Sequence, residues 1–192
     1  MTLLDGLTVA LAGAAFATMA WPALASEPPC PAERAVYTLN GDPAFTAGFI
    51  PSQHFASMAS DLYFRVTTPQ RTYWFTFGVS NGYSGISLGP VGSPYIAADG
   101  DPNNGPVDLD AGELNYPYMR IYPMDLDWRV HDDPPNKGDT APEVMFAPEL
   151  GQVLWYAPRA LTTDTTALRD PMDRAVFRRT GCLDKAPEPG LP

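Results

Sequence analysis

The sequence has little positive charge. Its 192 residues include 12 Lys and Arg against 22 Asp and Glu, a formal net charge of -10 at pH 7. Residues 99–133 carry nine of these acids and two arginines, so this one segment contributes a net charge of -7. A negative surface repels phosphate backbones and anionic lipid headgroups, which disfavours nucleic-acid binding and electrostatic membrane binding. A cation or a basic partner is the natural complement.

Histidine is also scarce, because the sequence contains two, His54 and His131. Few general bases are therefore present for the serine in residues 85–89, which spell the G-x-S-x-G string of a nucleophile elbow. An elbow needs a helix directly after its serine, whereas Pro90 follows here, and the predicted strand register places Ser87 inside a strand. We interpret the string as part of a strand and not as the site of a serine hydrolase.

Near the N-terminus the uncharged stretch 7–21 is too short for a comfortable bilayer crossing, which takes roughly 20 residues. The small-residue box at residues 23–25 follows it, so residues 1–25 are predicted to be a secretory signal peptide cleaved before Ser26. Its one charge is Asp5, where Lys or Arg is usual, and retention as an anchor is the alternative. After processing we expect a periplasmic or secreted protein without a membrane span.

Two cysteines, Cys30 and Cys182, lie near opposite ends of the predicted mature chain. In an oxidising compartment we expect them to form a disulfide, which for so long a loop contributes on the order of 5 kcal/mol by chain entropy. The bond requires Cα atoms about 4.4 to 6.8 Å apart, so it predicts that the first and last strands are neighbours. Two separate buried thiols are the alternative.

The composition favours many short strands. Hydrophobic residues make up 45% and aromatic residues 11%, which excludes wholesale disorder, and 22 Pro and 16 Gly punctuate the chain with turns. We predict a mainly β protein: one antiparallel β-sandwich or barrel-like domain over residues 26–184, with short helical pieces. A mixed α+β domain is the alternative. Residues 185–192, rich in proline, are predicted to be a flexible C-terminal tail.

A first hairpin is predicted from apolar alternation with period two in residues 62–67 and 72–79. Between them, Pro69 has a fixed φ that suits a type I turn and not the primed two-residue turns. We therefore expect a four-residue loop that pairs Thr67 with Thr72.

A second hairpin is predicted at Asn81-Gly82, because both residues tolerate the positive φ of a type I′ turn. Its register places Phe77 opposite Ile86 and Phe75 opposite Leu88. The two hairpins then agree on which face of the sheet is apolar.

Other elements are predicted from short apolar runs. Further strands are expected at residues 35–39, 118–122 and 175–179, and a hairpin between residues 144–146 and 153–156. A short helix is expected at residues 52–60 behind Pro51.

The acidic segment contains a candidate calcium loop. Oxygen-bearing side chains alternate at its start and continue downstream, and the candidate ligands are Asp99, Asp101, Asn103, Asp108, Asp110 and Glu113. The loop departs from an EF-hand, because Asn104 occupies the glycine position and the twelfth position lacks a bidentate Glu. The alternative is a plain solvated turn, which uses the same residue types.

A second acidic group combines residues 131–133 with Asp125 and Asp127. With one histidine and no local cysteine, we interpret it as a solvated loop and not as a metal site.

A candidate ligand platform lies on the polar face of the first hairpin, where Tyr63, Arg65 and Trp74 are predicted to lie together. Exposed rings of this kind stack on sugars or anchor a protein partner. The alternative is that a second layer or a loop covers this face.

No motif establishes an activity. The interpretation we carry forward is an exported, non-enzymatic module that binds a protein, a glycan or a small molecule. The alternative is a secreted hydrolase that uses carboxylates of residues 99–133, supported by Ca²⁺. That chemistry needs two carboxyl groups at a defined separation across a cleft.

Overall fold

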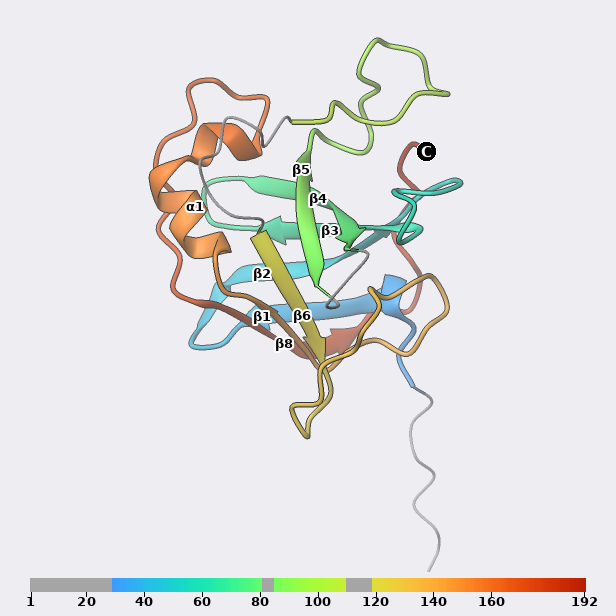
Figure 1. Cartoon of the computed structure of the whole chain (residues 1–192), viewed down its shortest axis with the longest axis vertical. Helices are drawn as coiled ribbons and strands as arrows, with labels where there is room; N and C mark the ends of the chain where they lie inside the picture. Colours follow the sequence, from blue (N-terminus) through green and yellow to red (C-terminus); the bar gives the residue numbers. More distant parts are fainter. Residues whose placement is uncertain (1–28, 81–84, 110–118) are drawn as a thin grey trace, which may run out of the picture.

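Eight antiparallel strands form one closed barrel (Figure 1). The computed structural model describes residues 29–80, 85–109 and 119–192, so the predicted signal peptide lies outside the described residues. Each strand pairs with its neighbours in chain order, and the last pairs with the first. The mainly β, antiparallel fold is confirmed, in the barrel form of the prediction. The strands are β1 Ala35–Leu39, β2 Asp42–Pro51, β3 Leu62–Thr67, β4 Thr72–Val79, β5 Ile86–Val91, β6 Met119–Met124, β7 Val144–Ala147 and β8 Ala175–Cys182.

Short helical pieces accompany the barrel, namely η1 Ala32–Arg34, α1 Leu150–Tyr156 and η3 Pro158–Leu161. The last two follow one another in the connection between β7 and β8. Within the described ranges, no helix combines the length and apolar character needed to span a bilayer.

The first predicted hairpin is confirmed residue by residue. β3 and β4 pair Thr67 with Thr72 and Phe64 with Phe75. The hydroxyls of Thr67 and Thr72 lie 3.2 Å apart, and Thr68 Oγ1 accepts hydrogen bonds from the turn N–H groups of Gln70 and Arg71. The threonine side chain thus closes the proline-containing turn that the sequence predicted.

The second hairpin has a different register from the one predicted. Phe77 pairs with Leu88 and Val79 with Ile86, so the observed pairing is shifted by two residues. The predicted turn at residues 81–82 lies outside the described residues. Because side chains alternate with period two, an even shift leaves every side chain on its predicted face, and the apolar face was correct although the register was wrong.

The barrel interior is filled by side chains from all eight strands. Inward positions alternate along each strand and are buried, as an eight-stranded barrel allows. The rings of Phe49, Phe64 and Phe77 lie within 6.3 Å of one another, centroid to centroid, and Phe177 meets Phe64 edge to face. Inward-facing side chains from every strand therefore occupy the interior of the barrel.

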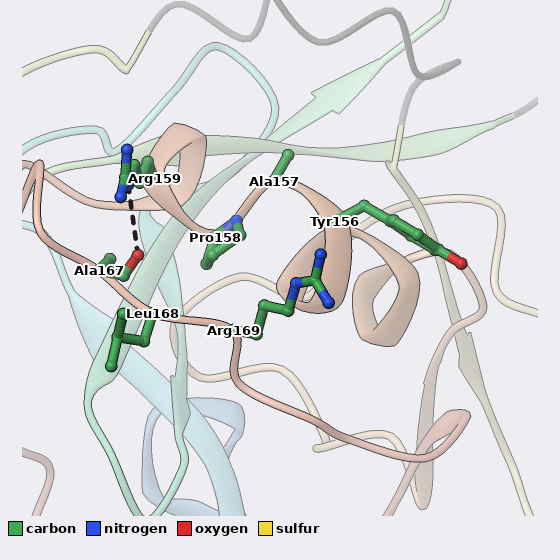
Figure 2. Close-up of a pocket in the computed structure, with 7 residues that line it drawn as sticks. All are labelled: Tyr156, Ala157, Pro158, Arg159, Ala167, Leu168 and Arg169. Atoms are coloured by element: carbon green, nitrogen blue, oxygen red, sulfur yellow. Dashed lines mark hydrogen bonds between the residues drawn. The ribbon is translucent and has the colours of Figure 1, made fainter.

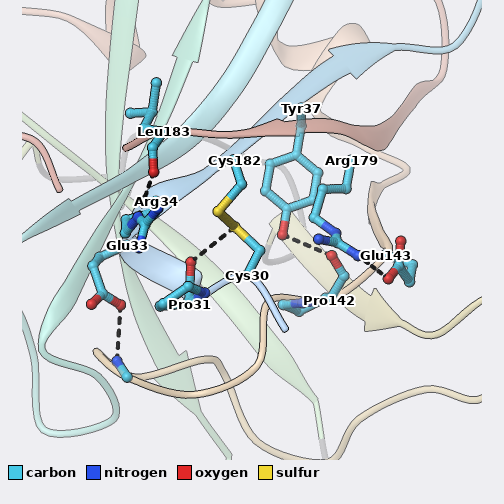
Figure 3. Close-up of a disulfide and its surroundings, with 11 residues drawn as sticks. Cys30, Pro31, Glu33, Arg34, Tyr37, Pro142, Glu143, Arg179, Cys182 and Leu183 are labelled. Atoms are coloured by element: carbon cyan, nitrogen blue, oxygen red, sulfur yellow. Dashed lines mark hydrogen bonds and ion pairs between the residues drawn. A yellow bond between two sulfur atoms is a disulfide. The ribbon is translucent and has the colours of Figure 1, made fainter. Parts of the chain in front are cut away.

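A disulfide joins Cys30 and Cys182 beside the seam between β1 and β8 (Figure 3). Their Cα atoms are 5.9 Å apart, and the predicted neighbourhood of first and last strands is confirmed. Nearby, Arg179 on β8 forms an ion pair with Glu143, and the Tyr37 hydroxyl donates to the carbonyl oxygen of Pro142 (2.9 Å). This network connects the seam to the chain that leads into β7.

The helix predicted at residues 52–60 was wrong, since this segment consists of bends. Ser52 Oγ accepts the N–H of His54, and Ser57 Oγ accepts the N–H groups of Ala59 and Ser60. Serine side chains that bind nearby N–H groups compete with helical hydrogen bonds, which is why the apolar spacing did not produce a helix.

The strand predicted at residues 153–156 was also wrong, because these residues belong to α1. Leu150, Val153 and Leu154 have the spacing of one helix face and are buried in the core. A run of four apolar residues does not distinguish strand from helix. The strand predicted opposite it, residues 144–146, is confirmed as part of β7, which pairs with β8 instead.

The last residues of the chain are hydrogen-bonded to the barrel. Gly190 N–H donates to the carbonyl oxygen of Pro51, and Leu191 N–H donates to that of Pro94, both at 2.7 Å. Composition led us to expect a flexible tail over residues 185–192, and these contacts were not visible in the sequence.

Candidate functional site

One end of the barrel carries α1, η3 and the segment that leads back to β8. The antiparallel order places four connections at this end: β1 to β2, β3 to β4, β5 to β6, and β7 to β8. We call residues 162–174 the return segment. It runs from η3 past α1 into β8, as the orange and red trace around α1 shows in Figure 1.

A glycine brings the return segment close to α1. A Cβ atom at Gly151 would lie 2.6 Å from the carbonyl oxygen of Met172 and 2.9 Å from that of Asp173. Real Cβ atoms do not approach backbone oxygens so closely, so glycine is required for this packing.

A buried carboxylate anchors the return segment to the barrel. Asp170 is 1% exposed; its Oδ2 accepts hydrogen bonds from the hydroxyls of Thr68 (2.5 Å) and Tyr73 (3.1 Å). Its N–H donates to the carbonyl oxygen of Leu154 in α1. Burial raises the pKa of Tyr73, and the charge of Asp170 adds to the rise, so this phenol stays protonated and serves as a donor. The segment is thereby tied to both the β3–β4 turn and α1.

The surface between α1 and the return segment is hollowed into a cavity of about 560 Å³ (Figure 2). Residues 156–159 form one wall and residues 167–169 the other. Two arginines, Arg159 and Arg169, line this space together with the exposed side chains of Tyr156 (63%) and Leu168 (69%), and no acidic residue is found among the described residues of the lining. We call it the basic cavity.

Both arginines are held from one side. Arg159 Nε donates to the carbonyl oxygen of Ala167 (3.4 Å), and the Arg169 guanidinium lies 5.1 Å from the centroid of the Trp155 ring. Two other arginines of the chain, Arg71 and Arg179, form ion pairs. In the described part of the chain, neither arginine of the basic cavity has an acidic partner.

A smaller cavity of about 300 Å³ lies on the other side of Trp155 along the same return segment. Asp42, Phe45 and Asp173 line it together with Trp155 and Met172. We call it the acidic cavity. Two carboxylates and an indole ring thus share a space that no motif indicated.

A third cavity, of about 490 Å³, lies at the opposite end of the barrel. Its lining includes the exposed Met58, the core residue Phe77 and Asp133. It provides a comparison for the two cavities beside α1.

The candidate calcium loop forms the tip of a hairpin that extends from β5, since Val91 bridges Asp108 and Ala97 bridges Pro106. Of its six candidate ligands, Asp110 and Glu113 lie outside the described residues. Asp108 is exposed on the returning arm of the hairpin.

The other ligands of this loop bind one another. Asp99 accepts hydrogen bonds from the N–H of Asp101 and the amide of Asn104, and Asp101 accepts from the N–H and the amide of Asn103. The bond from the Asp101 N–H, followed by that from Asn104, lowers the pKa of Asp99. Residues 99–104 therefore form a self-closed turn.

The second acidic group also forms a turn. Asp125 Oδ1 accepts the N–H groups of Asp127 and Arg129, and Trp128 between them has a φ of 63°. Across the described ranges, no three His, Cys, Asp or Glu side chains are arranged to hold a metal ion. Calcium binding stays a prediction.

The side chains of the predicted platform, Tyr63, Arg65 and Trp74, are buried or half-buried. Arg65 and Trp74 are paired across β3 and β4 as predicted, but both are half-buried and Tyr63 is buried. The Tyr63 hydroxyl donates to the carbonyl oxygens of Leu191 and Pro192, and burial raises its pKa to about 12. Ligand binding by these three residues stays a prediction.

The serine of the G-x-S-x-G string lies within β5, as predicted. Ser87 Oγ donates to the carbonyl oxygen of Gly78 on the neighbouring strand (3.4 Å). It occupies a regular strand position and not an exposed turn.

The residues that line the two cavities beside α1 were not found from the sequence. Arg159 and Arg169 are ten positions apart, and Asp42 and Asp173 are 131 apart, so no local spacing links them. Trp155 and Tyr156, followed by Pro158, are typical of the exposed end of a helix. We did not use this pattern, because these residues were predicted to be a strand.

Comparison with known proteins finds no matching family model, no matching curated protein and no matching solved structure. The function has to be argued from the geometry of the chain itself.

Proposed function

We propose that this protein is an exported, non-enzymatic binding module whose ligand is held beside α1, between that helix and the return segment. The packed interior carries this proposal, because it leaves the surface and the ends of the barrel as places for a ligand. Two of the three cavities described above flank α1, and exposed aromatic side chains stand between them.

The anchoring of the return segment supports the same region. Asp170 and Gly151 hold this segment against the barrel and α1, so the cavity walls are set before a ligand arrives. A preformed site loses less conformational freedom on binding than a site that has to be ordered.

Export is supported by the disulfide and by the signal-peptide pattern of the N-terminal residues. Mass spectrometry of protein recovered from its native compartment tests this part. We expect a chain that begins at Ser26 with no free thiol. A chain retaining residues 1–25 with two reactive thiols would contradict it.

The binding region is tested by NMR with ¹⁵N-labelled, disulfide-bonded protein and a panel of small acids, amines, sugars and neutral arenes. We expect the ligands that bind to shift the amide signals of residues 150–173. Shifts confined to Met58, Gly78 and Val79 at the third cavity would overturn the proposal. Trp155→Leu should weaken the observed binding, whereas Trp128→Leu in the distant turn is the matched control.

A secreted hydrolase is the second candidate, on one observation. Asp42 and Asp173 line the acidic cavity together, with Trp155 beside them. If the protein hydrolyses glycosides, Asp42→Asn and Asp173→Asn should each abolish turnover of a nitrophenyl glycoside panel, while Asp132→Asn leaves it unchanged. No turnover by the unmodified protein would contradict this candidate.

A further inference from the structure

We propose that the basic cavity binds an organic anion, a carboxylate carried on an apolar body, through the guanidinium groups of Arg159 and Arg169. The inference rests on the proposed function and names the chemical class of its ligand. It arises from two arginines that line one preformed cavity and have no acidic partner among the residues that the structure describes.

The charge of the cavity is opposite to that of the chain. Acidic residues outnumber basic ones by 22 to 12, yet the described lining of the basic cavity has two arginines and no carboxylate. Arg71, close to the same end, pairs with Asp164, which shows that acids of this region do reach arginines there. Arg159 and Arg169 remain available to an anion from solution.

Each guanidinium is oriented by the protein itself. Arg159 is held through Nε by the carbonyl oxygen of Ala167, which leaves its two terminal nitrogens as donors. The guanidinium carbon of Arg169 lies 5.1 Å from the centroid of the Trp155 ring, and this cation–π contact holds the group beside the cavity. A planar carboxylate matches two such donors in a bidentate manner, and the orientation reduces the entropy lost on binding.

The walls define the rest of the ligand. Tyr156 and Leu168 both line the cavity and present exposed apolar surface; in Figure 2 they lie on either side of Pro158. An apolar body buried against these side chains gains free energy that a bare inorganic anion does not. The cavity volume of about 560 Å³ accommodates a molecule of this kind.

The test uses 2-naphthoate, its neutral analogue 2-naphthamide and inorganic phosphate as probes, with the disulfide-bonded protein and NMR detection of Arg Nε–H and backbone amide signals. We expect 2-naphthoate to shift the signals of Arg159, Leu168 and Arg169, and to bind at least about tenfold more tightly than 2-naphthamide. Phosphate should bind more weakly than 2-naphthoate.

Single substitutions separate the charge from the cavity. Arg159→Gln and Arg169→Gln should each weaken 2-naphthoate by about tenfold and leave 2-naphthamide within about twofold. Arg129→Gln, an exposed arginine in the turn after β6, is the matched control and should change neither. Arg169→Lys keeps the charge but not the planar fork, so it should restore part of the affinity.

The outcomes distinguish the inference from the proposed function. Equal binding of 2-naphthoate and 2-naphthamide at the basic cavity would overturn the anion inference while ligand binding beside α1 stands. Tighter binding of phosphate than of 2-naphthoate would overturn the inference that the ligand carries an apolar body. If neither these probes nor the ligands of the broader panel shifted residues 150–173, both the inference and the proposed function would fail.

Discussion

The acidic turn at residues 99–104 and the basic cavity beside α1 are both charged surface features, but their polar atoms are used differently. In the turn, Asp99 and Asp101 accept hydrogen bonds from the backbone and side-chain amides of the same six residues. In the cavity, Arg159 and Arg169 are held from one side and keep donors for a ligand. The number of charges in a segment is therefore a poor guide to a site.

The two regions also differ in how the chain supports them. The acidic turn is closed by residues adjacent in sequence, and it lies at the end of a hairpin that extends from β5. The walls of the basic cavity are connected through Asp170 to Thr68 and Tyr73, about 100 positions away in the chain. Long-range support of this kind preorganises a site, whereas local closure organises only a loop.

If the basic cavity is built independently of the seam between β1 and β8, removal of the disulfide should destabilise the protein without changing the cavity. This is the largest loss of stability that we expect. The substitutions Cys30→Ser and Cys182→Ser together should lower the free energy of unfolding by up to about 5 kcal/mol, because the unfolded chain gains freedom. Urea denaturation measures the loss. The amide signals of residues 150–173 should keep their positions in the folded variant, and a collapse of those signals would show that the cavity depends on the seam.

The support of the cavity is tested by Asp170→Ala. It leaves the hydroxyls of Thr68 and Tyr73 without their buried acceptor, so we expect unfolding to become easier by about 3 kcal/mol. Asp101→Ala in the acidic turn is the matched carboxylate and should cost about 0.5 kcal/mol or less. If urea denaturation gave equal losses in the free energy of unfolding for the two variants, Asp170 would support the fold no more than Asp101 does.

Calcium binding would give the acidic turn a ligand as well. If the side chains of Asp99, Asp101 and Asn103 turn from their own backbone to a shared cation with a Kd of about 1 mM, 5 mM calcium should raise the Tm by about 3 °C relative to EDTA. Asp99→Asn with Asp101→Asn should remove the rise. An unchanged Tm in the unmodified protein would show the calcium prediction to be wrong.

The smallest expected effect concerns Asp164, an acid at the cavity end that does have partners. Hydrogen bonds from Thr166 and then from Arg71 lower its pKa to about 2 from an ordinary value of 3.8. Its carboxylate therefore contributes stability above pH 3.8 that is lost as the pH falls toward 2. In acid-range urea unfolding, Asp164→Asn should show a shallower decline below pH 4 than the unmodified protein, and identical declines would contradict this assignment.

Local rules predicted the elements in which local chemistry decides the structure. The β3–β4 hairpin was correct in loop length and register, because Pro69 restricts the turn and the flanking alternation allows one pairing. The next hairpin was predicted on the correct face with the wrong register, since an even shift has no cost in face burial. The prediction of a helix at residues 52–60 was wrong, because serine side chains compete with helical hydrogen bonds there.

The candidate site was beyond local rules. Tyr63 and Trp74 were predicted on the polar face of the first hairpin, with coverage by a second layer or a loop as the alternative. Their contacts come from distant parts of the chain, since the Tyr63 hydroxyl donates to the carbonyl oxygens of Leu191 and Pro192 and the Trp74 ring lies edge to face with Tyr95. Trp155 was expected in a strand, and its place on a helix beside Arg169 follows from the burial of Leu150, Val153 and Leu154 in the barrel end.

Alternation and turn chemistry act over a few residues, so they were enough to predict the β character of the chain and the inward face of β3 and β4; the cysteine pairing followed from an even count and an export signal. The closure of the barrel, the register of β5 and the placement of Arg159 and Arg169 around one cavity depend on the tertiary structure. These depend on which distant surfaces bury one another, and that free energy exists only when the whole chain has folded.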